Sequence, residues 1–264
     1  MSGPFAQSHR TFAPMRYFIE LAYRGTAFHG WQRQPEAESV QETIERALST
    51  LLNTPTEIVG CGRTDAGVHA AYYVAHFDTE RALPPRLVGK LNRYVHPAIA
   101  FRRIVPVGPE AHARFDAEHR AYYYDLVGAK DPFRTDTATF YPNLERLDAE
   151  KLHAAAALLL DYTEFFPFCK ANTDTKTMRC DLRRSEWVRT ATGWSYHIAA
   201  DRFLRGMVRL IVGMCLRVAE GKLSLDEVRT ALDTQTRLPR PWSAPAAGLY
   251  LTEVHYLPAI FPPA

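Results

Sequence analysis

The order of periodic segments restricts the fold more than any other feature of the chain, because nearly the same order occurs twice within 264 residues. In the first half, apolar alternation predicts strands and apolar residues three and four apart predict helices. The predicted strands cover 17–23, 56–59, 71–77 and 99–105. The predicted helices cover 40–52, which follows a capping box at Ser39–Glu42, and 85–93. This half therefore reads βαββαβ.

The second half starts the pattern again at His119. Strands are predicted over 119–127, 182–189, 194–199 and 249–256. A helix is predicted near 152–160, between the first two of these strands. A long amphipathic helix over 204–216 and a shorter helix after the capping box Ser224–Glu227 are predicted before the last strand. The repeated order predicts an α+β fold of two ferredoxin-like halves that form one broad antiparallel sheet, with helices on one face and an open face for a ligand.

Domain boundaries follow from these two halves. We expect a flexible leader over 1–14, an N-terminal subdomain over 15–112, a C-terminal subdomain over 113–258 and a short tail over 259–264. The leader lacks the apolar core of a secretion signal, and no stretch approaches the length of a membrane span. We therefore expect a cytoplasmic protein with no membrane partner.

The net charge and the cysteine content exclude few classes of function. The net charge of +3 permits a nucleic-acid partner without indicating one. The four cysteines show no zinc-binding spacing, so we expect reduced thiols and no metal. Any argument for RNA must come from local motifs.

The most unusual motif is the glycine-rich run over 60–69, which lies between two predicted strands and sets Asp65 between Arg63 and His69. It is not a dinucleotide-binding motif, because Asp65 stands where the third glycine would be and no helix pattern follows. From the residues alone, Asp65 is more often the cap of its own turn than a catalytic group.

The run Gly62–His69 resembles the signature of the tRNA pseudouridine synthase A family. Four further blocks resemble the family in the same order: 23–41, 112–124, 203–213 and 244–251. The resemblance covers about 16–256. The chain departs from the family pattern at Asp201, Arg205, Gly206 and Tyr123.

This resemblance implies a pseudouridine synthase fold with an RNA-binding cleft, and a homodimer that isomerises uridine to pseudouridine in the tRNA anticodon arm, at positions 38, 39 and 40. It implies Asp65 as the nucleophile. The reaction breaks the C1′–N1 bond and joins C1′ to C5, so no atoms are gained or lost and no cofactor is expected. A carboxylate can attack C1′ or assist a glycal-like intermediate, and the sequence leaves both routes open.

Three more residues receive roles from the resemblance. Arg209 would be the cation beside Asp65; otherwise it is a solvated helix edge. Tyr122 would stack on the target uracil; otherwise it is core packing. Arg63 would enter the space left by the flipped nucleotide; otherwise it pairs with Asp65.

Four residues are weaker candidates for RNA contact. His69 either takes part or holds the loop by a hydrogen bond. Arg33 and Gln34 follow the first strand, beside Trp31, which is either an RNA contact or buried packing. Arg205 flanks the apolar stripe of the long helix together with Arg209.

Three other functions compete with this one. A synthase of the same fold could act on another RNA site, and a ferredoxin-like topology alone would allow an RNA-binding module without catalysis. The carboxylate beside Arg63 argues against a pure binder. A thiol enzyme using Cys61 is a third class, which no partner-base spacing supports.

Overall fold

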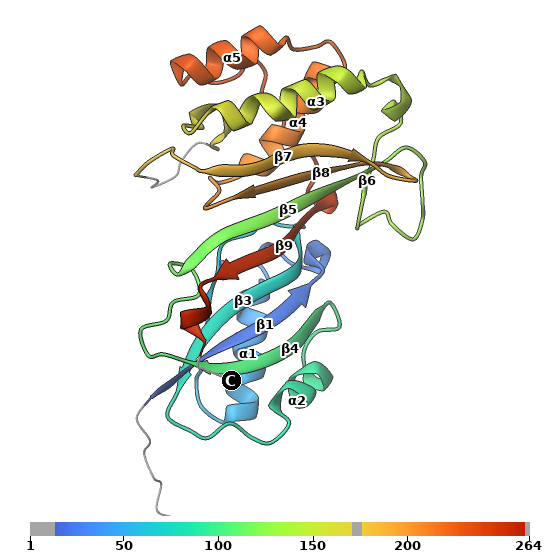
Figure 1. Ribbon diagram of the computed structural model, residues 1–264. Coiled ribbons are helices and arrows are strands. Elements are labelled where there is room, and N and C mark those ends of the chain that lie inside the picture. The colour runs from blue at the N-terminus through green and yellow to red at the C-terminus, as the bar shows by residue number, and fades with distance from the viewer. Residues whose placement is uncertain (1–13, 171–175, 262–264) are drawn as a thin grey trace, which may run out of the picture.

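The computed structural model describes residues 14–170 and 176–261 (Figure 1). The predicted leader over 1–14 lies outside the described residues apart from Pro14, as do residues 262–264 of the predicted tail. No helix of the described chain is long and apolar enough to cross a membrane.

The first half follows the predicted order of elements. It contains β1 (Met15–Tyr23), α1 (Val40–Leu52), β2 (Val59–Gly60), β3 (His69–Thr79), α2 (Leu87–Tyr94) and β4 (Ile99–Val107). The Ser39 hydroxyl accepts a hydrogen bond from the backbone N–H of Glu42 at 3.2 Å, which forms one half of the predicted capping box and starts α1. The second predicted strand is shorter than expected, since β2 contains only two residues.

The second half adds one short strand to the prediction. It contains β5 (Ala117–Val127), β6 (Thr139–Phe140), α3 (Ala149–Leu158), β7 (Leu182–Arg189), β8 (Gly193–Ala200), α4 (Met207–Ala219), α5 (Leu225–Thr234) and β9 (Leu249–Tyr256). Short 3₁₀ turns occur at Gly25–Ala27, Leu144–Arg146, Leu159–Asp161, Phe166–Phe168, Ala246–Gly248 and Pro258–Ile260. The capping box at Ser224 and Glu227 is fully formed and starts α5.

The nine strands of the described residues belong to one sheet, in the order β4-β1-β3-β9-β5-β8-β7, with β2 beside β3 and β6 beside β5 (Figure 1). The prediction of an antiparallel sheet is wrong at two places. The halves meet where His69 and Ala70 of β3 pair in parallel with Tyr250 and Leu251 of β9, and β5 pairs in parallel with β6. The sheet is therefore mixed, because the strands at which the halves join run in the same direction.

Two hydrophobic clusters stabilise the molecule. In the first half, Ile44 and Leu48 of α1 are completely buried with Ile19 of β1. In the second half, Ile211 of α4 is buried in the cluster that contains Tyr196 of β8. Burial of each such aliphatic side chain contributes about 1.5–3 kcal/mol. Strand β9 belongs to both cores, because Leu249 lies in the second cluster and Leu251, Val254 and Tyr256 lie in the first.

Candidate active site

The loop between β2 and β3 carries Asp65, and neighbouring backbone holds it in place. The backbone N–H of Val68 donates to the Asp65 carbonyl at 3.1 Å, and Gly67 has a φ of 78°, which a glycine adopts without strain. The N–H of Trp31 donates to the Thr64 carbonyl at 3.2 Å. These contacts fix the backbone on both sides of Asp65.

A second set of contacts explains why Gly30 precedes Trp31. Gly30 has a φ of 94°, and a Cβ added there would lie 2.6 Å from the Thr64 carbonyl oxygen. The Thr64 hydroxyl also shares a hydrogen bond of 2.8 Å with the Tyr23 hydroxyl. The first strand and the loop after it therefore pack directly against the Asp65 loop.

The Asp65 carboxylate meets two cations from the other half of the chain. Arg209 Nη1 lies 3.1 Å from Asp65 Oδ2, and Lys170 Nζ lies 3.4 Å from the same oxygen. The Asp65 side chain is 28% exposed. Within 14–170 and 176–261, no hydrogen bond reaches Oδ1, so one oxygen is held and the other is open to a ligand. Asp65 is therefore more than the cap of its own turn.

Arg209 lies in the first turn of α4 and is oriented by a backbone carbonyl. Its Nε donates to the carbonyl of Ala244 at 2.6 Å, while the Ala244 N–H donates back to the Arg209 carbonyl at 3.0 Å. Its side chain is only 17% exposed. Arg209 is thus not the solvated helix edge that the sequence left open.

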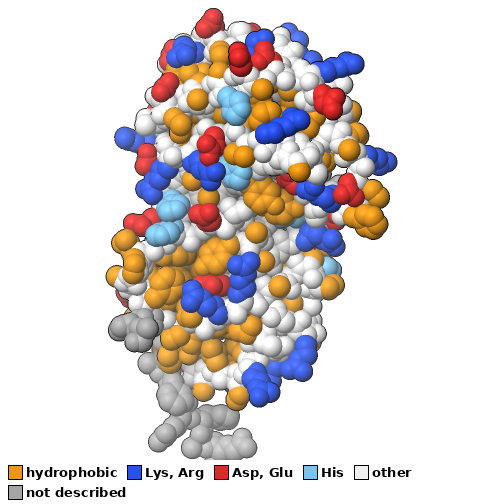
Figure 2. All heavy atoms as spheres, turned by 45° about the vertical axis from the view of Figure 1, so that its right-hand side comes forward, with side chains coloured by type: hydrophobic (Ala, Val, Ile, Leu, Met, Phe, Trp, Pro, Cys, Tyr) orange, Lys and Arg blue, Asp and Glu red, His pale blue; other side chains and the backbone are white. Residues whose placement is uncertain are grey.

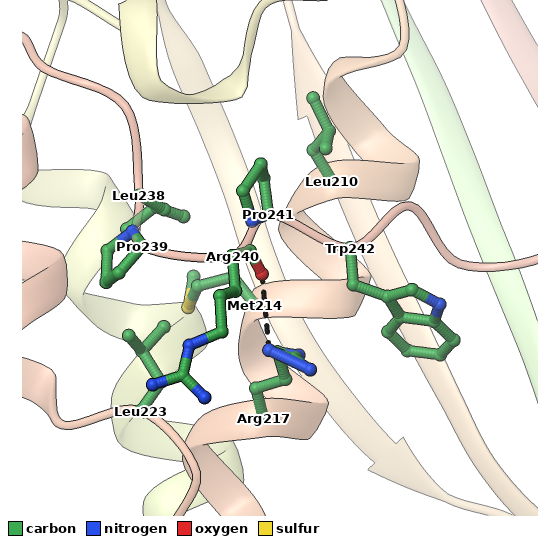
Figure 3. Close-up of a pocket in the computed structure, with 9 residues that line it drawn as sticks. All are labelled: Leu210, Met214, Arg217, Leu223, Leu238, Pro239, Arg240, Pro241 and Trp242. Atoms are coloured by element: carbon green, nitrogen blue, oxygen red, sulfur yellow. Dashed lines mark hydrogen bonds between the residues drawn. The ribbon is translucent and has the colours of Figure 1, made fainter.

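The segment that supplies Ala244 crosses α4 at a glycine. A Cβ at Gly213 would lie 1.9 Å from the Trp242 carbonyl oxygen, so only glycine allows this close approach. Figure 3 shows the crossing beside a small hollow, where Arg217 Nη1 donates to the Arg240 carbonyl at 3.2 Å. The crossing fixes the backbone that orients Arg209.

Tyr122 lies on β5 near Asp65 and is half-buried. Its ring packs edge-on against Phe203, with ring centroids 5.1 Å apart. Burial raises the pKa of Tyr122 well above its usual value, and the charge of Asp65 raises it further. The phenol therefore stays protonated at neutral pH.

A cluster of arginines lies beside this site. Burial lowers the pKa of Arg114, and the positive charges of Arg63, Arg120 and Arg202 lower it further. Arg63 is exposed and forms no ion pair with any described residue, so the alternative that it pairs with Asp65 does not hold here. Figure 2 shows Lys and Arg side chains on both halves of one face, with hydrophobic side chains between them.

Arg120 joins three parts of the site through backbone carbonyls. Its guanidinium donates to the carbonyls of Ala117 at 2.8 Å, Asp201 at 2.9 Å, Cys61 at 2.9 Å and Arg114 at 2.6 Å. These neutral acceptors leave its charge uncompensated. Arg120 therefore links the start of the Asp65 loop to the segment before α4.

His69, one of the weaker candidates for RNA contact, is buried and bonded to backbone. His69 is 1% exposed; its Nδ1 accepts from the Gly25 N–H at 3.0 Å, so its Nε2 carries the proton and donates to the Ala247 carbonyl at 3.1 Å. Burial lowers the pKa of His69. This neutral, fully bonded ring fits the alternative of holding the loop.

The residues after the first strand are mostly engaged within the protein. Arg33 Nη2 lies 2.7 Å from Glu45, and the Gln34 side chain donates to the His29 carbonyl at 2.7 Å. Trp31 is 3% exposed and stacks on Tyr73 with ring centroids 4.1 Å apart, so it is buried packing. Arg205 is exposed.

The chemistry of this site does not come from the thiol. Cys61 is completely buried, and burial raises its pKa to about 11, so the reactive thiolate is scarce at neutral pH. Among the described residues, no group of three or more His, Cys, Asp or Glu side chains could hold a metal ion.

Two contributors escaped the sequence analysis. Lys170 lies outside all of the matching blocks, and Arg120 lies within the block 112–124 but received no role there. The departure at Gly206 was the available signal for Lys170, because that glycine lies against the lysine stem.

Comparison with known proteins agrees with this geometry. A family model described as tRNA pseudouridine synthase matches residues 21–116 and 156–257. The chain is 45% identical to tRNA pseudouridine synthase A of Parabacteroides distasonis over 249 residues, which cover 94% of this chain and 98% of the relative. It is 46% identical to the Bacteroides thetaiotaomicron protein of the same name, covering 93% and 92%, and 33% identical to one from Staphylococcus aureus, covering 91% of each chain.

Proposed function

Since this chain belongs to the tRNA pseudouridine synthase family, we propose that it isomerises uridine to pseudouridine in the tRNA anticodon arm, at positions 38, 39 and 40. Asp65 is the nucleophile in this proposal. The observation that carries it is the Asp65 carboxylate, whose Oδ2 contacts Arg209 and Lys170 while its Oδ1 accepts no hydrogen bond from the described residues. Tyr122 lies close enough to Asp65 for that charge to add to burial in raising the pKa of its phenol.

The proposed chemistry requires an ionised carboxylate at C1′ of the target nucleotide. Arg209 forms an ion pair with this carboxylate from a fixed position. The C1′–N1 bond breaks, the uracil turns, and C1′ joins C5. The proton on C5 is lost and N1 gains one, so the product has the same atoms as the substrate.

RNA binding in this proposal depends on uncompensated charge and one aromatic ring. Arg63, Arg114 and Arg202 supply guanidinium groups for phosphates, and Arg120, which is bonded to backbone carbonyls, adds its positive charge. Tyr122 stacks on the uracil, and the exposed Arg63 enters the space left by the flipped nucleotide. Contacts to phosphates and RNA shape suit an enzyme that modifies several adjacent uridines.

The finer description of the architecture is also part of the proposal. The strand orders β2-β3-β1-β4 and β7-β8-β5-β9 support two ferredoxin-like halves that correspond to the subdomains over 15–112 and 113–258. The family resemblance supports a homodimer that acts in the cytoplasm without a cofactor. Sedimentation of the pure chain measures the dimer directly.

The direct test is to incubate the purified chain with an unmodified tRNA transcript, without added cofactor, and to map pseudouridine along the RNA. We expect conversion at positions 38, 39 and 40. Conversion only at other positions would replace the anticodon-arm target, and no conversion in any tRNA would argue for a non-catalytic binder.

The nucleophile is tested by Asp65→Asn. We expect turnover to be lost while the Kd for tRNA changes only a few-fold, because the substitution removes the reacting group and disturbs phosphate contacts little. Asp226→Asn, which removes an exposed carboxylate on α5, is the matched control and should keep full turnover. Turnover of Asp65→Asn within about tenfold of wild type, a loss of only 1.4 kcal/mol, would refute the assignment.

A further inference from the structure

Lys170 reaches the Asp65 carboxylate from a segment outside the family motifs. Its backbone N–H donates to the Arg205 carbonyl at 3.0 Å, which holds it beside the start of α4. Its Nζ lies 3.4 Å from Asp65 Oδ2, and its side chain is 36% exposed. The ammonium group is therefore close to the carboxylate but is also accessible to solvent.

The path of the lysine stem depends on the glycine before α4. Gly206 has a φ of 71°, and a Cβ added there would lie 2.7 Å from Lys170 Cδ and Cε and 2.8 Å from Cγ. Three consecutive carbons of the stem would be too close, so the lysine could not yield by turning its tip alone. Any larger residue at 206 would displace the ammonium from Asp65.

We propose that Lys170 is a positioning residue for the Asp65 nucleophile, and that Gly206 leaves the space that the Lys170 side chain needs to reach Asp65. This inference rests on the proposed function. Arg209 and Lys170 both hold Oδ2, so the carboxylate cannot rotate without losing two charge-assisted contacts. The pair thereby keeps Oδ1 directed at the substrate.

Arg209 and Lys170 contribute differently to the site because their surroundings differ. Arg209 is 17% exposed and is tied to the Ala244 carbonyl, so it is a fixed partner. Lys170 is more exposed and approaches as a compact charge on a flexible stem. A lysine in this place could also bind an RNA phosphate, and the two roles give different kinetics.

The first test measures Lys170→Met, which removes the ammonium but keeps the stem's bulk. We expect the single-turnover rate at saturating tRNA to fall about three- to tenfold, because the ion pair is partly exposed, with the Kd for tRNA within about twofold. Lys176→Met removes an exposed lysine charge that makes no ion pair with Asp65 and should change the rate by less than about twofold.

Two results would overturn this role. One is an unchanged single-turnover rate together with an unchanged Kd. The other is an unchanged rate with a raised Kd and a weaker salt dependence, which would make Lys170 a phosphate contact.

The second test asks whether Gly206 acts through Lys170. Gly206→Ala should lower the rate about as much as Lys170→Met. In a Lys170→Ala background the stem is gone, so Gly206→Ala should then cause no further loss of rate. Backbone strain at position 206 would persist in both backgrounds and is followed separately by thermal unfolding. An equal loss of rate in both backgrounds would overturn the role of Gly206.

These results remain separable from the proposed function. If Asp65→Asn keeps turnover, the nucleophile assignment fails whatever Lys170 does. If Asp65→Asn is inactive while Lys170→Met has the wild-type rate, only the inference about Lys170 fails.

Discussion

At the residue scale, the site depends on where hydrogen-bonding capacity is left unused. Asp65 Oδ2 is held by two cations, Arg209 Nε is occupied by a carbonyl, and both nitrogens of His69 are bonded to backbone. Asp65 Oδ1 and the Tyr122 hydroxyl, in contrast, have no hydrogen bond from the described part of the chain. Few groups at this site therefore remain available to a substrate.

Tyr122→Phe tests which part of the tyrosine is needed. Stacking requires only the ring, so we expect nearly full turnover and affinity for Tyr122→Phe. Tyr122→Ala should lose about 1–3 kcal/mol, the usual contribution of stacking on one base. Single-turnover kinetics and tRNA binding measure both effects, with Tyr123→Phe as the neighbouring control. A large loss of rate in Tyr122→Phe would give the hydroxyl a chemical task.

The roles of single residues were only partly predictable from the sequence. The family signature pointed to Asp65, Arg209 and Tyr122, and the structure brings these three together. Lys170 was not predictable, because its contact joins residues 105 apart and depends on the absence of a side chain at Gly206. Neither hydrophobic periodicity nor sequence motifs indicate a contact between two such distant residues.

At the scale of elements, α4 connects the core to the site. Its apolar residues fill the second hydrophobic cluster, while its first turn presents Arg209 and its middle is crossed by the segment at Trp242. The apolar stripe predicted this helix from 204. It begins only at Met207, because Gly206 in a left-handed conformation precedes it.

Gly213→Ala tests the crossing. The added Cβ would meet the Trp242 carbonyl, and such overpacking costs about 1–3 kcal/mol. We expect lower stability in urea unfolding and a lower rate, because displacement of the segment moves the Ala244 carbonyl away from Arg209. Gly89→Ala, in an open position on α2, is the control and should not destabilise the protein. Wild-type stability and rate in Gly213→Ala would show that the segment moves freely.

Most elements were predictable because each has several periods of apolar residues. Strands β7 and β9 have the predicted bounds, and α1 begins at its predicted cap. The parallel ladders between β5 and β6 and between β3 and β9 consist of two residue pairs each. Such short segments do not produce a periodic pattern in the sequence. They were therefore missed, and the sheet was expected to be antiparallel.

At the scale of the whole molecule, buried histidines link stability to pH. His76 on β3 is 4% exposed, and its Nδ1 accepts from the Ala113 N–H at 3.1 Å. Burial, helped by the charges of Arg16 and His112, lowers its pKa to about 4. Above pH 6.5 the ring is neutral whether the chain is folded or not. Between pH 6.5 and 4 only the unfolded chain binds the proton, so folding weakens as pH falls.

His76→Gln should reduce this pH dependence. We expect the free energy of unfolding of the wild type to lose about 2 kcal/mol between pH 7 and pH 5 through His76 alone, and His76→Gln should lack that part of the loss. Urea unfolding at both pH values measures it, with His255→Gln on the surface as control. If the free energy of unfolding changed equally with pH in the wild type and in His76→Gln, His76 would not be a cause of the pH dependence.

The distance along the chain between Asp65 and Arg209 also has a consequence during synthesis. The two residues are 144 positions apart. At about 5–20 residues per second, a ribosome needs roughly 7–30 s to add the residues that separate them. During that interval the growing chain carries the carboxylate without its fixed cation. In the proposed mechanism, newly made protein therefore cannot modify tRNA until Arg209 has been translated.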